Sequence, residues 1–197
     1  MTFTIKQIPT LITLIRFPAA VGLIWDAKDG TASALFLPLF IIAGLSDALD
    51  GFLARKLKAT SVSGALIDGY ADIALYTACL ISACLIYPDI LKQYALELIG
   101  LIFIQLVSWG FSLIKFGKMT SYHTYSAKIW GIMAVLSFLV LFGFNSGIIF
   151  PFMILAGFIC NTEEILMTNI MPYWKAGILN YQMAKALRDE FKNKLNN

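Results

Sequence analysis

The chain is 197 residues long, with 59% hydrophobic residues, 14% charged residues and a formal net charge of +3. Its mean hydropathy of +0.77 leaves too little polar surface to cover a water-soluble globule. The composition therefore predicts a membrane protein, organised as a single membrane domain over residues 1–197, and we expect no nucleic-acid partner.

Apolar runs of about twenty residues follow one another along the chain, and each is long enough to cross a ~30 Å hydrocarbon layer as a helix. We predict six membrane-spanning helices, in the ranges 9–25, 33–53, 63–87, 94–116, 126–144 and 148–171. We expect the first range to be a retained helix and not a signal peptide, because Arg16 interrupts it and no small-residue cleavage pattern follows. The sequence thus predicts an all-α integral membrane protein.

The basic residues indicate how these helices are oriented. They concentrate at the N-terminus, in the connections after the second and fourth helices, and in the tail, whereas the opposite side has only Lys28 and Lys92. By the positive-inside rule, both termini are predicted to be cytoplasmic.

The tail from 181 to 195 has the pattern of an amphipathic helix. Met183, Leu187, Phe191 and Leu195 recur every four residues and form one apolar stripe, with basic residues elsewhere. We expect a C-terminal surface helix that lies on anionic lipid.

Four aspartates lie in the second and third predicted helices. Asp47 and Asp50 are three residues apart, and Asp68 and Asp72 are four apart, so each pair shares a helix face. A charge at mid-bilayer costs about 2.5 to 3.5 kcal/mol on insertion scales. A lone aspartate there often has a structural partner, but two face-matched pairs predict a divalent-cation site. All-oxygen ligation favours Mg²⁺, Mn²⁺ or Ca²⁺ over zinc or copper.

Small and basic residues accompany the acids. Gly51 and Ala54 allow a backbone or a ligand to approach closely, and Arg55 offers a fork suited to phosphate. The eight residues that stand at fixed offsets are Asp47, Asp50, Gly51, Ala54, Arg55, Gly64, Asp68 and Asp72. They reproduce the signature DxxDGxxAR(x8)GxxxDxxxD, so the chain resembles the CDP-alcohol phosphatidyltransferases.

The resemblance implies transfer of a phosphatidyl group from CDP-diacylglycerol to a small alcohol acceptor, with release of CMP. It implies Mg²⁺ or Mn²⁺ as cofactor, with Asp47, Asp50, Asp68 and Asp72 as ligands and Asp72 also as the general base. The residues implied in binding the CDP donor are Thr10, Asp50, Gly51, Ala54, Arg55 and Gly64.

The first helix is also similar to the family, which often begins it with PNxxTxxR. Pro9, Thr13 and Arg16 match that pattern, while Thr10 replaces the asparagine. A single threonine such as Thr13 commonly bonds back to its own helix, which is the structural alternative for this residue.

The acceptor site is predicted in the connection before the fifth helix, where Lys118, Ser126 and Lys128 are candidates for binding an anionic head group. The positive-inside rule alone also explains these lysines. Glycerol 3-phosphate is the favoured acceptor, although Ile73 replaces a lysine common in enzymes that use it. Inositol phosphate, serine and other head groups remain open.

The resemblance further implies a homodimer, and the charge distribution implies an active site facing the cytoplasm, in a bacterial inner membrane or its equivalent. A cation transporter is an alternative that explains the acids but not Gly51, Ala54, Arg55 and Gly64 at their fixed offsets. The intact motif argues against an inactive relative. In the sixth helix, Glu163 and Glu164 are expected either to pair with Lys128 or Arg16 or to lie near the membrane interface.

Overall fold

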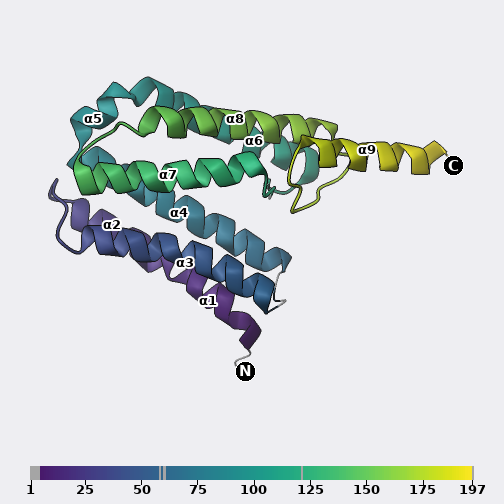
Figure 1. Cartoon of the computed structure of the whole chain (residues 1–197). Helices are drawn as coiled ribbons and strands as arrows, with labels where there is room; N and C mark the ends of the chain where they lie inside the picture. The colour runs from purple at the N-terminus through teal and green to yellow at the C-terminus, as the bar shows by residue number, and fades with distance from the viewer. Residues whose placement is uncertain (1–4, 58, 60, 121, 197) are drawn as a thin grey trace. The chain divides into compact units, whose positions relative to one another are not determined.

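The computed structural model describes residues 5–57, 59, 61–120 and 122–196, and within these residues every regular element is a helix (Figure 1). The elements are the 3-10 helix η1 (Ile5–Gln7) and the α-helices α1 (Ile8–Leu14), α2 (Arg16–Ala27), α3 (Phe36–Lys56), α4 (Val62–Ile86), α5 (Pro88–Gln93), α6 (Ala95–Phe116), α7 (Tyr125–Phe144), α8 (Phe150–Ile170) and α9 (Tyr181–Asn196). Six stretches of the described chain are long and apolar enough to cross a membrane, counting α1 and α2 together. The predicted all-α architecture and its six spans are confirmed.

The first span is not one continuous helix. α1 ends at Leu14 and α2 begins at Arg16. Pro18 explains the break, because proline has no amide hydrogen to donate to the carbonyl of Leu14 four residues earlier. Arg16 is therefore the first residue of a new helix.

By packing, the chain divides into two compact units. The first comprises residues 1–93 and 138–147, and the second comprises residues 94–137 and 148–197. That the chain is a single domain stays a prediction.

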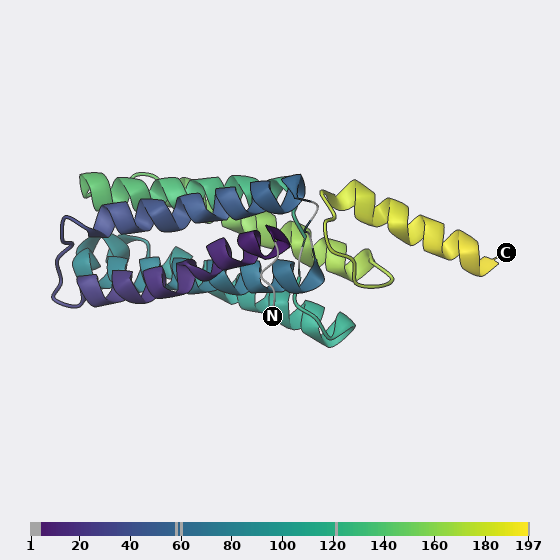
Figure 2. The same cartoon turned by 90° about the horizontal axis from the view of Figure 1, so that it is seen from below.

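In the first unit, both α1 and α2 contact α3 and α4, and Figures 1 and 2 show α3 running beside the α1–α2 segment. Small buried residues form the helix contacts, among them Ala19 and Ala27 of α2 and Ala71 and Ala78 of α4. Small residues let helix backbones approach closely in a membrane, where no hydrophobic effect drives helices together. This close packing fixes α3 and α4, which contain the four aspartates, against the first span.

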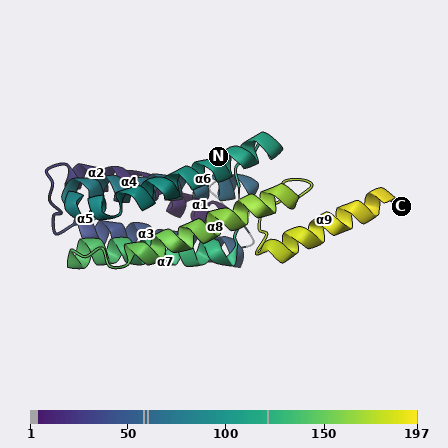
Figure 3. The ribbon, with the colours of Figure 1, turned by 90° about the horizontal axis from the view of Figure 1, so that it is seen from above.

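In the second unit, α6 and α8 pack side by side (Figure 3). Gly157 of α8 marks the tightest approach, because a Cβ atom added there would lie 2.6 Å from Leu101 Cδ1 and 2.7 Å from Trp130 Nε1. The helix α9 packs on α8. A small apolar core joins them, formed by Tyr122, Met167, Met171, Ile178, Ala184 and Leu187.

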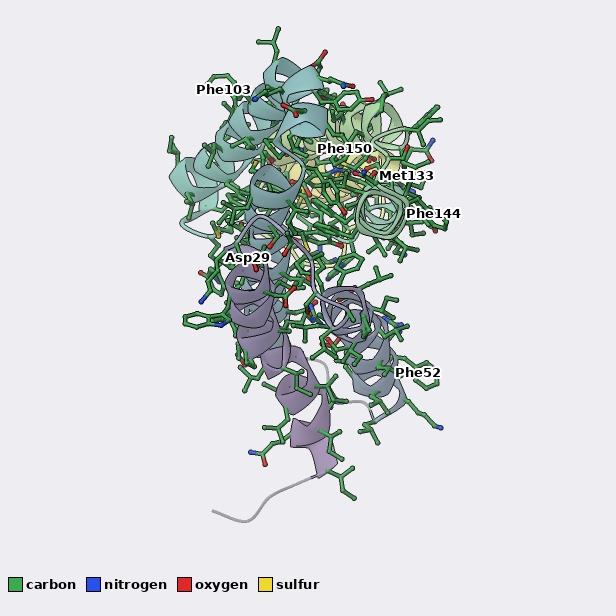
Figure 4. All side chains as sticks on the ribbon, turned by 90° about the vertical axis from the view of Figure 1, so that its left-hand side faces the viewer. Asp29, Phe52, Phe103, Met133, Phe144 and Phe150 are labelled. Atoms are coloured by element: carbon green, nitrogen blue, oxygen red, sulfur yellow. The ribbon has the colours of Figure 1, made fainter. Side chains whose placement is uncertain are left out.

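Large apolar side chains cover much of the outer surface. Phe52, Phe103 and Phe144 are 53%, 67% and 78% exposed, and Figure 4 shows Phe52 projecting away from the helices. So many exposed large apolar side chains are unfavourable in water, whereas hydrocarbon accommodates them. The exposed side chains and the six spans define an integral membrane protein.

Candidate active site

The structure brings the four aspartates together. Asp47 and Asp50 are on α3, and Asp68 and Asp72 are on α4, near the short connection that joins these helices. Asp47, Asp50 and Asp68 each offer a carboxylate oxygen, and these oxygens lie within 4.8 Å of one another. The two helix faces that the spacing of the acids defines therefore meet.

The guanidinium group of Arg16 lies among the four carboxylates. Its Nη1 is 3.3 Å from Asp47 Oδ1 and 2.5 Å from Asp72 Oδ1. Its Nη2 is 3.0 Å from Asp68 Oδ1 and also donates to Asp50 Oδ2. The Arg16 side chain is completely buried, so one cation contacts every acid of the motif.

Thr13, one turn before Arg16, also contacts this cluster. Its hydroxyl lies 2.5 Å from Asp50 Oδ2 and 3.1 Å from the carbonyl oxygen of Pro9. The bond back to its own helix is present, as expected for a lone threonine, but the shorter contact is to the carboxylate. Thr13 and Arg16 together fix Asp50 at the buried end of the site.

The cluster is closed at one end and open at the other. The side chain of Asp50 is only 5% exposed, whereas those of Asp72 and Asp47 are 37% and 50% exposed. Asp68 is 32% exposed, so three of the four carboxylates are accessible to a ligand and Asp50 is not.

The donor set fits a divalent cation. When all four carboxylates are ionised, they and the guanidinium have three formal negative charges in a small volume, and carboxylates this close repel one another unless a cation offsets them. Every ligand atom is a carboxylate oxygen, which suits Mg²⁺ or Mn²⁺ and does not suit a soft metal. Asp47, Asp50 and Asp68 have oxygens close enough together to hold one ion, and that Asp72 is a fourth ligand stays a prediction.

Two of the residues expected to bind the donor line one pocket. Its volume is about 400 Å³, and its walls are formed by Gln7, Thr10, Leu11, Ser61, Ser63, Gly64 and Ile67. The hydroxyl of Ser61 caps α4 by accepting from the amide of Gly64 at 3.0 Å, and an added Cβ at Gly64 would lie 3.0 Å from that hydroxyl. Glycine at this position thus keeps both the cap and the pocket wall in place.

Gly51 and Arg55 form a second group, on α3. An added Cβ at Gly51 would lie 3.5 Å from Arg55 Nη1, so the guanidinium folds back along the helix over the glycine. Ala54 is half-buried and Arg55 is exposed. Arg55 is thus available to an anionic ligand beside the acids of its own helix.

The three residues expected to bind the acceptor belong to the second unit. Lys118 Nζ lies 4.9 Å above the Trp174 ring, and Lys128 Nζ lies 5.1 Å above the Tyr125 ring. The hydroxyl of Ser126 donates to Glu163. Both lysines are exposed, so each remains accessible to an anion.

The two glutamates of α8 have different partners from those expected. Glu163 accepts from the hydroxyl of Ser126, and Glu164 accepts from the hydroxyls of Ser108 and Thr120 at 3.1 and 3.2 Å. Among the described residues their partners are thus hydroxyl groups and, for Glu163, the backbone amide of Tyr181. Pairing with Lys128 or Arg16 was the wrong expectation, because hydroxyl donors of the same unit satisfy these carboxylates.

Tyr122, beside this pair of glutamates, is buried and shares a hydrogen bond of 3.1 Å with Thr168. Burial, and to a smaller extent the nearby charge of Glu164, raises the pKa of the Tyr122 phenol. It therefore stays neutral at physiological pH.

Arg16 was not among the site residues predicted from the sequence. The position of Arg16 could have indicated this role, because a lone arginine within an apolar span requires an acidic partner. The aspartates on the matched faces of the next two spans were the obvious candidates for that partner.

A cluster of carboxylates at the ends of two adjoining helices, in a chain with six candidate membrane spans and with an exposed arginine on one of those helices, defines a membrane protein with a candidate metal site. The CDP-alcohol phosphatidyltransferase family model matches residues 6–172, and the chain belongs to that family.

The relatives that match the chain are enzymes named CDP-diacylglycerol–glycerol-3-phosphate 3-phosphatidyltransferase. That of Haemophilus influenzae is 49% identical over 81 residues, which are 41% of this chain and 43% of the relative. That of Wigglesworthia glossinidia brevipalpis is 41% identical over 69 residues, 34% of this chain and 37% of the relative. A chloroplastic and mitochondrial enzyme of Arabidopsis thaliana is 37% identical over 87 residues, 41% of this chain and 28% of the relative.

In each case the chain matches less than half the length of the relative. No solved structure gives a significant match.

Proposed function

We propose that the protein transfers a phosphatidyl group from CDP-diacylglycerol to an alcohol in phospholipid biosynthesis and releases CMP. The observation that supports this most strongly is the set of four motif aspartates gathered around Arg16, in a chain of the CDP-alcohol phosphatidyltransferase family. The favoured acceptor is glycerol 3-phosphate, because the relatives' names specify that substrate. Inositol phosphate and serine are the alternatives for the same chemistry.

In the proposed reaction, the acceptor hydroxyl oxygen bonds to the phosphorus that bears the diacylglycerol. The bond from this phosphorus to the oxygen bridging it to CMP breaks, and CMP leaves with the bond's electrons. Asp72 takes the hydroxyl proton, which suits a carboxylate that is 37% exposed at the open end of the cluster. A bound Mg²⁺ or Mn²⁺ would offset the charge of the diphosphate.

The remaining motif residues bind the donor. Asp47, Asp50 and Asp68 hold the metal together with Asp72. Thr10 and Gly64 shape the pocket of about 400 Å³, and Gly51, Ala54 and Arg55 present a small-residue surface with a phosphate-binding fork.

The acceptor's anionic group is assigned to Lys118, Ser126 and Lys128. Exposure of both lysines supports this assignment, and a charge-assisted contact from lysine suits a phosphate monoester. The active site is proposed to face the cytoplasm, in a protein that functions as a homodimer with α9 lying on anionic lipid.

The test uses purified protein in detergent or lipid with radiolabelled CDP-diacylglycerol and a panel of acceptors that includes glycerol 3-phosphate, inositol phosphate and serine. CMP release should require an acceptor and stop when EDTA removes the metal, and Mg²⁺ or Mn²⁺ should restore it. Greatest turnover with glycerol 3-phosphate would support that acceptor. Absence of CMP release with every acceptor, alongside metal-dependent cation uptake into vesicles, would establish a transporter instead.

A further inference from the structure

We infer that Arg16 is a built-in counter-cation that holds the carboxylate cluster together in the absence of metal and limits how strongly the cluster attracts a metal. This inference rests on the proposed function, because it concerns the metal site of that reaction.

The first support is that both terminal nitrogens of Arg16 contact the motif aspartates. Nη1 reaches Asp47 and Asp72, and Nη2 reaches Asp50 and Asp68. The remaining nitrogen, Nε, is buried and has no hydrogen-bond partner among the described residues. An arginine that served only to pack α2 against its neighbours would not direct both terminal nitrogens at four different acids.

The second support is charge. With Arg16 the cluster has three formal negative charges, and without it the same four carboxylates would have four. Because Arg16 and Asp50 are almost completely buried, water screens them poorly. Loss of the guanidinium should therefore destabilise the metal-free fold far more than loss of a surface cation.

The same charge opposes metal binding. The guanidinium nitrogens lie within 3.3 Å of the carboxylate oxygens that would hold the ion, so a divalent cation there is repelled by Arg16. A positive charge about 5 Å from a divalent ion changes its affinity on the order of tenfold even at the dielectric constant of water. Arg16 thus lowers the metal affinity of the cluster, and it also keeps the four carboxylates together before a metal binds.

The experiment compares the wild-type protein with Arg16→Gln, measuring thermal unfolding with and without Mn²⁺ and Mn²⁺ affinity by titration calorimetry. Without metal, Arg16→Gln should unfold roughly 5 to 20 °C lower, as expected for breaking a buried ion pair in a chain of this length. Saturating Mn²⁺ should close most of that gap, and Mn²⁺ should bind the variant on the order of tenfold more tightly. Lys28→Gln is the matched control, because it removes an exposed cation at the other end of α2 and should change neither quantity.

Two further variants separate charge from packing. Arg16→Gln combined with Asp47→Asn again has three formal negative charges, so it should recover most of the metal-free stability. Arg16→Lys retains the positive charge but lacks the two terminal nitrogens of the guanidinium. Its metal-free unfolding temperature should lie between those of the wild-type protein and Arg16→Gln. This variant keeps the test valid if Arg16→Gln does not fold.

Three results distinguish the possible failures. Equal losses of stability with and without Mn²⁺, or no recovery in the double variant, would show that Arg16 acts through packing, and the inference would be wrong. Weaker Mn²⁺ binding by Arg16→Gln would also overturn it. If the wild-type protein bound no divalent cation at all, the proposed metal-dependent function itself would be wrong.

Discussion

The contact between Thr13 and Asp50 gives a quantitative prediction about the buried end of the site. Replacing Thr13 by valine keeps the branched shape but removes the hydroxyl that lies 2.5 Å from Asp50 Oδ2. Hydrogen bonds to charged groups contribute about 1.5 to 3 kcal/mol, and 1 kcal/mol corresponds to about 2–4 °C in a chain of 150–250 residues. Thr13→Val should therefore unfold roughly 3 to 12 °C lower than the wild-type protein.

The measurement is thermal unfolding in detergent without divalent metal, so that no ion compensates for the lost donor. Thr162→Val is the control, because the exposed hydroxyl of Thr162 donates, among the described residues, only to the carbonyl oxygen of Phe158 in its own helix, at 2.7 Å. Its loss should change the melting temperature little. Equal changes in the two variants would show that the bond between Thr13 and Asp50 contributes no stability, and the argument for a fixed Asp50 would fail.

Two other substitutions test the site and the packing behind it. Asp72→Asn should lower turnover by about 10² to 10⁴, the usual contribution of a general base, while donor affinity measured at a fixed metal concentration stays within a few-fold. If Asp72→Asn retained a tenth or more of wild-type turnover, the general base would have to be another residue. Gly157→Ala should destabilise the protein by about 1 to 3 kcal/mol, because the new methyl group would lie within 3 Å of Leu101 and Trp130. Gly110→Ala, which meets nothing within 4 Å, should be neutral or slightly stabilising in the same unfolding assay.

The six spans could be predicted from the sequence because hydrocarbon thickness imposes a length and a composition on each membrane helix. The meeting of the two aspartate pairs could be predicted because a spacing of three or four residues fixes a helix face, and a short connection makes the helices neighbours. Both predictions depend only on residues close together in the sequence. The structure contains the six spans and brings aspartates of the two helices together.

The position of Arg16 depends instead on tertiary packing. Its register along α2 follows from the break that Pro18 causes in the first span, and no periodicity in the sequence indicates which of several acids a lone arginine will contact. Of the two expectations for Glu163 and Glu164, pairing with Lys128 or Arg16 was wrong for a related reason, and a position near the membrane interface stays a prediction. Charge alone suggests a lysine or an arginine, whereas hydroxyl groups brought near by folding satisfy the carboxylates.

The position of Arg16 has a consequence for how the protein is made. A ribosome synthesises the first span before the second and third, so Arg16 reaches the membrane before its partners, 34 residues later at Asp50 and 56 later at Asp72, can lie beside it in the bilayer. An unpaired arginine within a span disfavours insertion by about 2.5 to 3.5 kcal/mol. The second and third spans remove that cost when their aspartates reach Arg16, so we expect them to stabilise the first span in the bilayer.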